Sequence, residues 1–537
     1  MRTTSPTALI ELMAVSFAAL LVISPFPPAI GSGGAIEIAA VDGTVDRPDS
    51  TQIDSCTVIS ESGKYALSDD IEDTPAETCI RVRADDVVLD GRGHVLASNG
   101  NGGSDGLLVR QSTNVTVRNL SVTKWETGIH FENTVDGTVR NVVAIDNRRT
   151  GICLEKATSM TLTNITAADN VAPELSPFPR PSQSAGVLAI DSRNTRLSDA
   201  NVSRNVGGIS FVGSTDIVVS NSVATANEIG FFLRGANDTV RGSVAAGNNV
   251  GFFADNATGS SLANVSAVSN RVGFGVENTT NARLNDANAS SNFLGISVVR
   301  SHGVSMGNIT AKNDFVGINF LESRRSTLSE SEISGNEFIG AALVETTATR
   351  LSNTTIETTA GNESVSGATS AGIYLNGSDA RLEDVTTANN DNWTIFAERE
   401  SNLDATHVSL DETRLSFVGT DIALDSTRRP PLPSHPTKRV AFGRSLVISR
   451  TTAAGMLDAQ FEYDRRAVSD ADVIERKLRL WRYDGNWSPV CDSRIDTDHA
   501  VVSATLSRPD RAVFTVLGER GDSGPNPGSN AGIDERC

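Results

Sequence analysis

The chain has 537 residues and a formal net charge of −19, from 65 acidic and 46 basic residues. This length exceeds one ordinary globular core, so several domains or a solenoid are expected. The acidic balance argues against nucleic acid and anionic membrane as partners.

Lysine is scarce, since only six of the basic residues are lysine and the other forty are arginine. An acidic surface with little lysine keeps its hydration at high salt. A haloarchaeal origin would explain this bias, and so would a high genomic GC content.

The N-terminus predicts a secretory signal peptide over residues 1–34. An apolar run from Leu12 to Ile23 ends at prolines that begin with Pro25. This run has the length of a signal h-region and is short for a membrane span. We therefore expect a protein that is secreted or held at the cell surface, with no membrane insertion after signal removal. A linker is expected at 35–55.

Five cysteines are present, at Cys56, Cys79, Cys153, Cys491 and Cys537. In an exported protein Cys56 and Cys79 are candidates for a disulfide at the start of the fold. The odd count leaves at least one thiol without an intramolecular partner. No CxxC motif or Cys/His cluster is present, so no zinc site is predicted.

Residues 56–105 read as short strands between Gly and Asp turn signals. The two cysteines followed by VVLDGRGHVL resemble the first coils of NosD-like proteins. That resemblance implies a right-handed parallel β-helix of the pectate-lyase-like architecture.

A repeat of about 22 residues occupies 106–425 and predicts one solenoid coil per repeat. Its anchor glycines are 21 to 23 residues apart except for gaps of 35 and 32. They are Gly106, Gly128, Gly151, Gly186, Gly208, Gly230, Gly251, Gly273, Gly295, Gly317, Gly340 and Gly372, and Trp393 takes the place of a thirteenth.

Two internal columns follow from stacking the coils in register. Phe231, Phe252 and Phe274 are expected to stack inside the coils. Asparagines three or four residues before each glycine predict a hydrogen-bonded ladder. Its expected members are Asn147, Asn170, Asn205, Asn227, Asn248, Asn270, Asn292, Asn313 and Asn336.

The C-terminal part predicts a separate small domain. A proline-rich linker covers 426–442, and 443–518 reads as five strands of a β-sandwich-like domain with a turn at Asp484-Gly485. The tail 519–537 has the composition of a disordered segment. The complete fold class is therefore all-β.

A candidate binding surface lies two residues after each glycine, where side chains should point outward. Leu188, Phe232, Phe253 and Tyr374 belong to this column. Phe232 and Phe253 are expected to stack in the open, between insertions at 171–184 and 359–370, and could bind a sugar ring. The alternative is that the insertions fold over the stripe and cover it.

Catalytic and metal candidates are fewer. Glu132, Glu155 and Asp191 follow their glycines by four or five residues and would suit Ca²⁺ or an acid/base pair. They would equally suit a solvated turn of an acidic protein. The NosD resemblance implies copper-site assembly, for which only His130 above Cys153 offers neighbouring donors.

Asn-x-Ser/Thr sequons recur with the repeat and are acceptors for glycans in exported proteins. They include Asn114, Asn164, Asn201, Asn264, Asn288 and Asn308.

The sequence thus favours a noncatalytic exported protein whose partner is polysaccharide or another envelope glycan. A divergent polysaccharide lyase or hydrolase, and an accessory protein for copper-site assembly, are the alternatives.

Overall fold

The computed structural model describes residues 50–100, 104–171, 181–357, 359–360, 369–426, 434–436 and 438–520. The expected signal peptide, most of the first linker, most of both insertions, much of the proline-rich linker and nearly all of the tail lie outside these residues. The described chain divides into two compact units, 50–288 and 289–520, called the first and second unit below.

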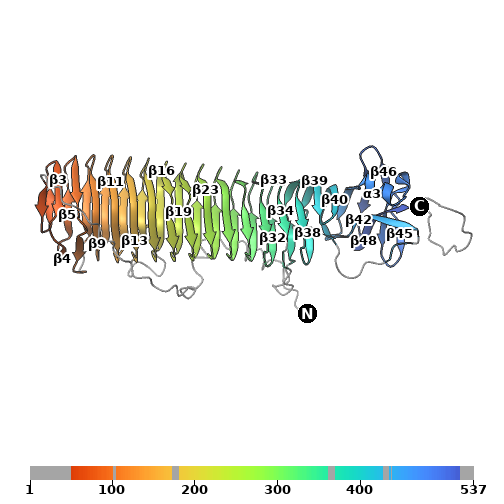
Figure 1. Ribbon diagram of the computed structural model, residues 1–537, viewed down its shortest axis with the longest axis horizontal. Helices are drawn as coiled ribbons and strands as arrows, with labels where there is room; N and C mark the ends of the chain where they lie inside the picture. The colour runs from red at the N-terminus through yellow and green to blue at the C-terminus, as the bar shows by residue number, and fades with distance from the viewer. Residues whose placement is uncertain are drawn as a thin grey trace, which may run out of the picture. The chain divides into compact units, whose positions relative to one another are not determined.

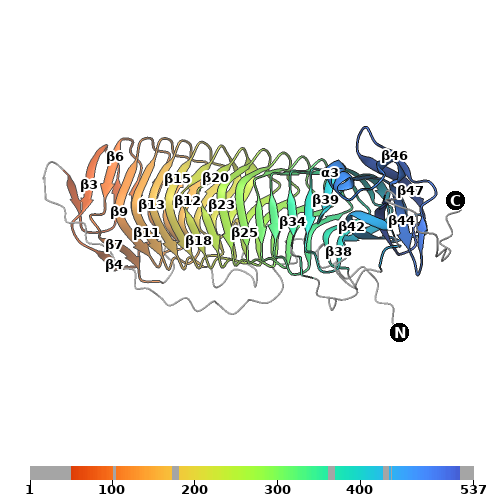
Figure 2. The same ribbon diagram turned by 45° about the vertical axis from the view of Figure 1, so that its right-hand side comes forward.

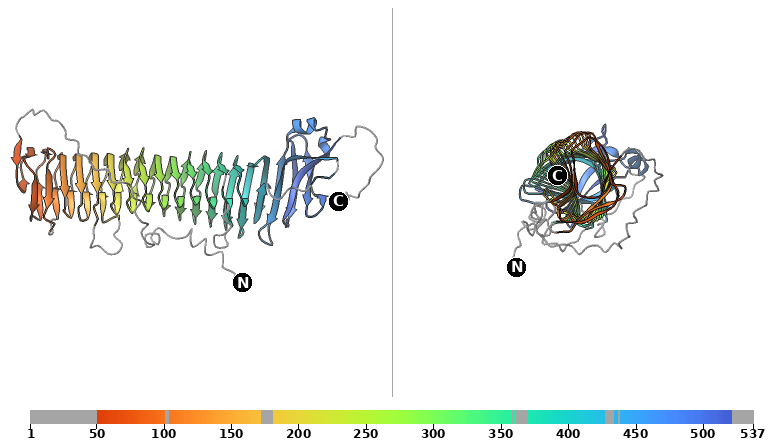
Figure 3. Two further views of the ribbon diagram at one scale, coloured as in Figure 1. Left: turned by 60° about the horizontal axis from the view of Figure 1, so that its bottom comes forward. Right: turned by 90° about the vertical axis from the view of Figure 1, so that its left-hand side faces the viewer.

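The first unit is a parallel β-solenoid, as the repeat predicts (Figures 1, 2 and 3). Each coil contributes to two walls, wall A and wall B, and every strand pairs in parallel with its equivalent in the next coil. Wall B contains β2 (Thr57–Ile59), β5 (Thr78–Val82), β8 (Asp105–Arg110), β10 (Thr127–Glu132), β12 (Thr150–Glu155), β14 (Ala185–Ile190), β16 (Gly207–Thr215), β19 (Ile229–Ala236), β22 (Val250–Asp255) and β24 (Val272–Glu277).

Wall A of the first unit is bent within each coil, because one residue there has a positive φ, such as Asn164 at 53° or Asn264 at 52°. Its strands are β1 (Thr51–Ile53), β3 (Gly63–Leu67), β4 (Ile71–Thr74), β6 (Val87–Asp90), β7 (Val95–Ser98), β9 (Thr116–Thr123), β11 (Thr138–Ile145), β13 (Thr161–Ala168), β15 (Arg196–Ser203), β17 (Val218–Ser220), β18 (Val223–Thr225), β20 (Thr239–Arg241), β21 (Val244–Ala246), β23 (Ser261–Val268) and β25 (Arg283–Ser290).

The second unit begins with the same two walls. Its parallel wall B strands are β26 (Leu294–Val299), β29 (Val316–Leu321), β32 (Ile339–Val344), β35 (Ala371–Asn376) and β38 (Trp393–Glu398). Its parallel wall A strands are β27 (Ser305–Gly307), β28 (Thr310–Lys312), β30 (Thr327–Ser329), β31 (Glu332–Ser334), β33 (Thr349–Ser352), β34 (Thr355–Glu357), β36 (Asp379–Glu383), β37 (Thr386–Ala388) and β39 (Asn402–Leu410).

Antiparallel strands then continue both walls of the second unit. On wall B, β38 pairs with β41 (Ile422–Ser426), β41 with β42 (Arg439–Arg450), β42 with β48 (Ala512–Glu519), β48 with β44 (Arg479–Tyr483) and β44 with β45 (Trp487–Pro489). On wall A, β39 pairs with β40 (Thr413–Thr420), β40 with β43 (Met456–Glu462), β43 with β47 (Val501–Ser507) and β47 with β46 (Arg494–Asp496). The short helices α3 (Arg465–Asp470) and η1 (Glu475–Lys477) lie in the connection that follows β43.

Strands before and after the expected linker at 426–442 therefore pair with each other. The sequence places a domain boundary in this segment, whereas β41 and β42 form one antiparallel ladder across it. The expected turn at Asp484-Gly485 joins β44 to β45, and Gly485 has a φ of 120°. Within the described residues, no helix has the length and apolar character that crossing a membrane requires.

The expected aromatic column fills the interior of the first unit. Phe231, Phe252 and Phe274 are at most 1% exposed, and their rings stack with centroids 4.6 Å and 5.0 Å apart. The glycine beside this column allows close coil contact, since a Cβ added at Gly230 would lie 2.6 Å from the carbonyl oxygen of Gly251.

The asparagine ladder is confirmed in the first unit, with one change in the second. Each Nδ2 from Asn147 to Asn248 donates to the Oδ1 of the next rung, at 2.9–3.2 Å. In the second unit the rung after Asn292 is Asp314, so the predicted member Asn313 is wrong. Asn313 is exposed and has a φ of 57°, because it occupies the left-handed corner one residue earlier.

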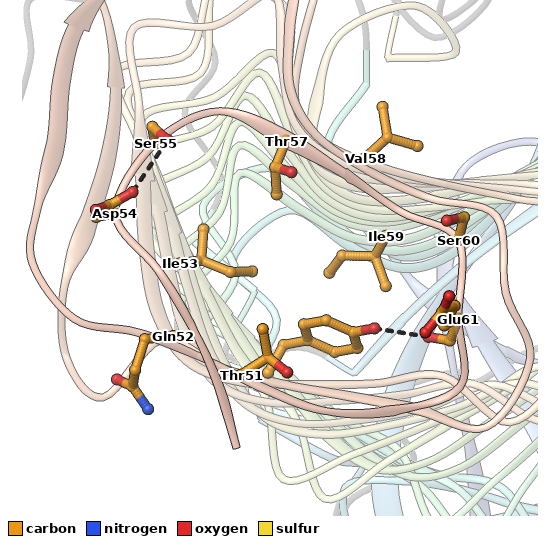
Figure 4. Close-up of a pocket in the computed structure, with 11 residues that line it drawn as sticks. Thr51, Gln52, Ile53, Asp54, Ser55, Thr57, Val58, Ile59, Ser60 and Glu61 are labelled. Atoms are coloured by element: carbon orange, nitrogen blue, oxygen red, sulfur yellow. Dashed lines mark hydrogen bonds between the residues drawn. The ribbon is translucent and has the colours of Figure 1, made fainter. Parts of the chain in front are cut away.

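The first coils are joined by the predicted disulfide. Cys56 and Cys79 are bonded across β2 and β5, which are equivalent strands of neighbouring coils. Figure 4 shows the interior of the first described coil, where Ile53 and Ile59 point inward. This interior is a hollow of about 210 Å³, and the Tyr65 hydroxyl donates to the carbonyl oxygen of Glu61 at its rim.

Candidate ligand-binding surface

The outward face of wall B has two adjacent columns of side chains rather than one. Ala185 and Leu188 pack together with Cys153, although Ala185 precedes the coil's glycine and Leu188 follows it by two residues. In the register with the next coil, Ala185 pairs with Gly207 and Val187 pairs with Ile209, whereas Gly186 between them is not among the paired residues. This irregularity places the residue before each glycine on the outward face.

Phe232 and Phe253 lie in the predicted column and contact each other, with ring centroids 5.7 Å apart. The expectation that they are exposed is wrong, because they are only 3% and 6% exposed. Their outward neighbours Ile229 and Val250 are 1% and 2% exposed, so these side chains are buried as well.

Charged side chains border this pair. The Arg234 guanidinium lies over the Phe232 ring at 5.2 Å, and its Nε donates to Asp255 Oδ2 at 3.0 Å. The guanidinium therefore interacts with protein groups and covers one face of the Phe232 ring. A ring that binds sugars by stacking would need that face to be accessible.

The described end of the first insertion lies on the same face. A Cβ added at Gly207 would be 3.1 Å from Pro181 Cβ, and the Ser184 hydroxyl donates to the carbonyl oxygen of Arg149. Leu188, beside this contact, is 2% exposed. At this place the described end of the insertion, residues 181–184, lies against the face, and Leu188 does not form part of an open stripe.

The three carboxylate candidates do not form one column. Glu132 and Glu155 are paired in register, whereas the partner of Glu155 in the next coil is Ile190. Asp191 is thus one residue out of the column, at a left-handed corner with a φ of 49°. The sequence already indicates this shift, because Asp191 follows its glycine by five residues and the two glutamates follow theirs by four.

Glu132 and Glu155 are each matched by cations. Arg110 Nε lies 2.6 Å from Glu132 Oε2, and hydrogen bonding to Arg110 lowers the pKa of Glu132 despite its partial burial. Lys156 Nζ lies 3.4 Å from Glu155 Oε1. A carboxylate held ionised by an arginine is a poor proton donor, which disfavours Glu132 as a general acid.

His130 and Cys153 face each other on paired strands, as expected. Burial lowers the pKa of His130, but hydrogen bonding to Asp105 and Cys153 outweighs it and raises the pKa to about 10. A metal ion would have to displace this proton before the imidazole could bind it. Among the described residues, no group of three or more potential metal ligands includes His130 and Cys153.

Tyr374, the fourth predicted ligand residue, belongs to a cluster on wall B of the second unit. Its ring stacks on Phe396 with centroids 6.1 Å apart, and Trp393 is tilted against Phe396 at 6.0 Å. Tyr374 is 4% exposed, while Phe396 and Trp393 are half-buried. We call Tyr374, Asn376, Trp393, Phe396 and Glu398 the aromatic–acid cluster.

A hydrogen-bonded carboxylate adjoins these rings. The Tyr374 hydroxyl donates to Glu398 Oε1 at 2.7 Å, and Asn376 Nδ2 donates to the same oxygen at 3.0 Å. Burial, followed by these contacts with Glu398, raises the pKa of Tyr374, so its hydroxyl keeps its proton. Glu398 is thereby fixed in place.

Two further charged groups lie beside Trp393. The Arg511 guanidinium is 5.4 Å from the Trp393 ring centre, and Thr394 Oγ1 donates to Asp425 Oδ1 at 3.4 Å. Burial raises the pKa of Asp425 to about 6. The surface thus combines partly open rings with carboxylates and a guanidinium.

Sequence reasoning missed Phe396 and assigned Trp393 to the glycine position. The ladder pairs Trp393 with Ala371, which places Thr394 opposite Gly372. Trp393 therefore belongs to the outward column before the glycine. The sequence did contain a sign of this site. One coil has an aromatic residue at both outward positions, Trp393 before the glycine position and Phe396 two residues after it.

Comparisons with known proteins agree with this fold. Residues 105–272 match the family model described as right handed beta helix region. No curated protein sequence matches the chain.

Solved structures similar to the chain include a tailspike protein, an alginate epimerase and a pectate lyase. The Dettilon tailspike protein is 12% identical, with 87% of this chain and 86% of that chain covered and a TM-score of 0.39. The periplasmic alginate epimerase AlgG is 10% identical, with 64% and 76% covered and a TM-score of 0.30. Pectate lyase Pel9A is 17% identical, with 48% and 70% covered and a TM-score of 0.31. The family-model match and the strand ladders establish that residues 105–272 form a right-handed parallel β-helix.

Proposed function

We propose that this protein is exported and binds polysaccharide or another envelope glycan without cleaving it, at the aromatic–acid cluster. The observation that carries the proposal is the half-buried pair Trp393 and Phe396 beside the fixed carboxylate of Glu398. A sugar ring has apolar C–H faces that pack on aromatic rings, and hydroxyls at its edge that need acceptors.

The acceptor is preorganised. Glu398 Oε1 receives two hydrogen bonds from Tyr374 and Asn376, which hold the carboxylate at one orientation. Little side-chain freedom is then lost when a ligand hydroxyl binds the other oxygen. This arrangement favours binding of a ligand hydroxyl at a fixed position.

The test is glycan-array binding of the mature protein at high salt, followed by calorimetry with each hit. Trp393→Ala is expected to lower affinity at least about tenfold, because ring stacking supplies roughly 1.4 kcal/mol or more. The matched control is Phe293→Ala, which removes another partly exposed ring of the same unit (Phe293 is 39% exposed). Equal binding by wild type and Trp393→Ala would refute the proposed surface.

A separate assay tests the proposal that the protein does not cleave the glycan that it binds. Bound glycans are incubated with the protein and assayed for new reducing ends and for unsaturated products. The expected result is neither, and either product would show that the protein is an enzyme.

A further inference from the structure

Wall A of the first unit has an uncharged strip that runs from coil to coil. In each coil from β9 to β23, the two outward positions after the bend of wall A hold no charged side chain, and the residue between them points inward and is buried. These positions are aligned by the strand register. The strip consists of Ser121, Thr123, Val143, Ile145, Thr166, Ala168, Asn201, Ser203, Val223, Thr225, Val244, Ala246, Ser266 and Val268.

The rest of wall A differs from this strip in charge. Before the bend, the same coils carry outward arginines, namely Arg118, Arg140, Arg196 and Arg241. In the second unit, the positions after the bend include Lys312, Glu332 and Glu357. Since 21% of the whole chain is charged, the strip is distinguished by composition as well as by position.

The strip is open at its centre and rigid over most of its length. Val223 and Val244 are register partners in neighbouring coils and are 39% and 37% exposed. An exposed apolar pair within an uncharged surface is a candidate contact for a ligand. Most of the strip is valine, isoleucine or threonine, whose branching at Cβ restricts χ1. Little side-chain entropy is therefore lost when a ligand covers them.

Charged groups occur only beside the strip, at the corner that follows it. Asp146, Asp169 and Arg204 occupy this corner, each with a positive φ. Arg204 donates to the Asp169 carboxylate at 2.7 Å and 2.6 Å, so these two charges already have partners. A ligand that lies on the strip itself buries no charged side chain, which would be costly without a partner.

The dimensions of the strip select an extended ligand. Seven coils about 4.8 Å apart make it roughly 29 Å long, with about 7 Å between its two columns. Its area is on the order of 300 Å², less than half of the roughly 800 Å² that each partner contributes to a stable protein complex. A flat surface also cannot enclose a small ligand as a pocket does.

Charge further restricts the ligand. The chain has a formal net charge of −19, which repels a polyanion and also a second copy of the same chain. A neutral polymer is not repelled. Its hydroxyls can bond to the serine and threonine hydroxyls and to the exposed Asn201 amide, while its C–H groups contact the valines.

We propose that the uncharged strip binds an extended neutral polysaccharide, which lies along the stacking direction of the first unit's coils. This surface is separate from the aromatic–acid cluster and does not require that cluster to bind a glycan.

The experiment uses the full chain with Trp393→Ala, so that the aromatic–acid cluster does not supply the binding. Sedimentation with insoluble cellulose, insoluble β-1,3-glucan and insoluble mannan reports binding to neutral polysaccharides, and calcium alginate gel is the anionic probe. The protein is expected to bind at least one of the neutral polysaccharides and to bind alginate more weakly.

Variants in the same background then locate the surface. Val223→Glu with Val244→Glu should lower binding at least about tenfold, because unpaired carboxylates would have to be buried under the polysaccharide. Thr225→Glu with Ala246→Glu, in the other column of the same two coils, should have the same effect. The charge-matched control is Val58→Glu with Val135→Glu, at valines that are 54% and 40% exposed outside the strip. Thermal unfolding identifies the folded variants, and either folded strip variant suffices for the comparison.

The outcomes separate this inference from the proposed function. The strip is overturned if the Trp393→Ala protein binds none of the three neutral polysaccharides or prefers alginate. It is also overturned if a folded strip variant binds as well as the control variant. Glycan-array binding that depends on Trp393 would still support the aromatic–acid cluster in each of these cases. Conversely, array binding that is unaffected by Trp393→Ala overturns the cluster and leaves the strip standing.

Discussion

Asp314 takes the place of an asparagine beside Asn292 in the ladder of the second unit. Its Oδ1 accepts from the backbone N–H of Asn292 at 2.7 Å and from Asn292 Nδ2 at 3.1 Å. Its Oδ2 is buried without a hydrogen-bond partner in the described structure. An asparagine would direct an N–H to this side, as Asn336 does toward the carbonyl oxygen of Ala311.

The first prediction concerns the pH dependence of stability. Burial raises the pKa of Asp314 to about 7, although hydrogen bonds from Asn292 oppose the shift. The unfolded carboxyl titrates near pH 4, so between about pH 4 and about pH 7 the folded state holds a proton that the unfolded state has released. Stability should therefore fall as pH rises through this window.

Asp314→Asn should remove part of that fall. It is expected to raise the free energy of unfolding at pH 8 by roughly 2–4 kcal/mol, with little change at pH 4. Asp238 contributes the same dependence, because burial raises its pKa to about 7. Denaturant unfolding at several pH values measures the effect, and Asn248→Asp, at an equivalent rung of the first unit, should introduce it. An unchanged pH profile in both variants would contradict the assignment.

The second prediction compares two phenylalanines in stacks. Phe252 lies at the centre of a buried stack, whereas Phe293, at the end of a stack with Phe315, is 39% exposed. Phe252→Ala should lower the free energy of unfolding by roughly 3–5 kcal/mol, and Phe293→Ala by about 1 kcal/mol or less. Similar losses would show that Phe293 is buried in solution.

The third prediction concerns the Cys56–Cys79 disulfide, which joins residues 23 apart in sequence. Cys56→Ser with Cys79→Ser should lower stability by about 3 kcal/mol, through greater freedom of the unfolded chain. Limited proteolysis should then cleave first within 50–100. Cys153→Ser, at a cysteine outside that disulfide, is the control and should leave the cleavage pattern unchanged.

The fourth prediction separates positioning from binding at Glu398. Tyr374 and Asn376 both donate to Oε1, so Glu398→Gln can retain both bonds through its amide oxygen. Ligand affinity should fall roughly tenfold, because a charged acceptor is lost, while stability changes by less than about 1 kcal/mol. Glu398→Ala should lower both. Calorimetry and thermal unfolding measure the two effects, and undiminished affinity in Glu398→Gln would remove Glu398 from the ligand surface.

Much of the solenoid could be predicted, because in stacked coils equivalent residues lie at the same number of positions from the glycine of each coil. The Phe231, Phe252 and Phe274 column and the ladder from Asn147 to Asn248 follow from that offset alone. Asn313 and Asp314 show the limit, since two adjacent polar residues fit the pattern equally and only the left-handed corner separates them.

The candidate site was less predictable, because repeat offsets give the direction of a side chain but not what covers it. Phe232 and Phe253 point outward as expected and are nevertheless buried. The sequence pattern assigned Trp393 to the glycine position, whereas its register partner is Ala371, the residue before the glycine. The spacing of the apolar residues does not show this difference of one residue.

The antiparallel strands that follow β38 and β39 determine where the second unit stops. Coils that are all parallel present an edge on which a further identical coil can be added, by the same chain or by another copy. Here both walls reverse direction and finish in β45 and β46, strands of only three residues each. These antiparallel ends do not continue the coil repeat, so this end of the fold does not present the edge on which an identical parallel coil would stack.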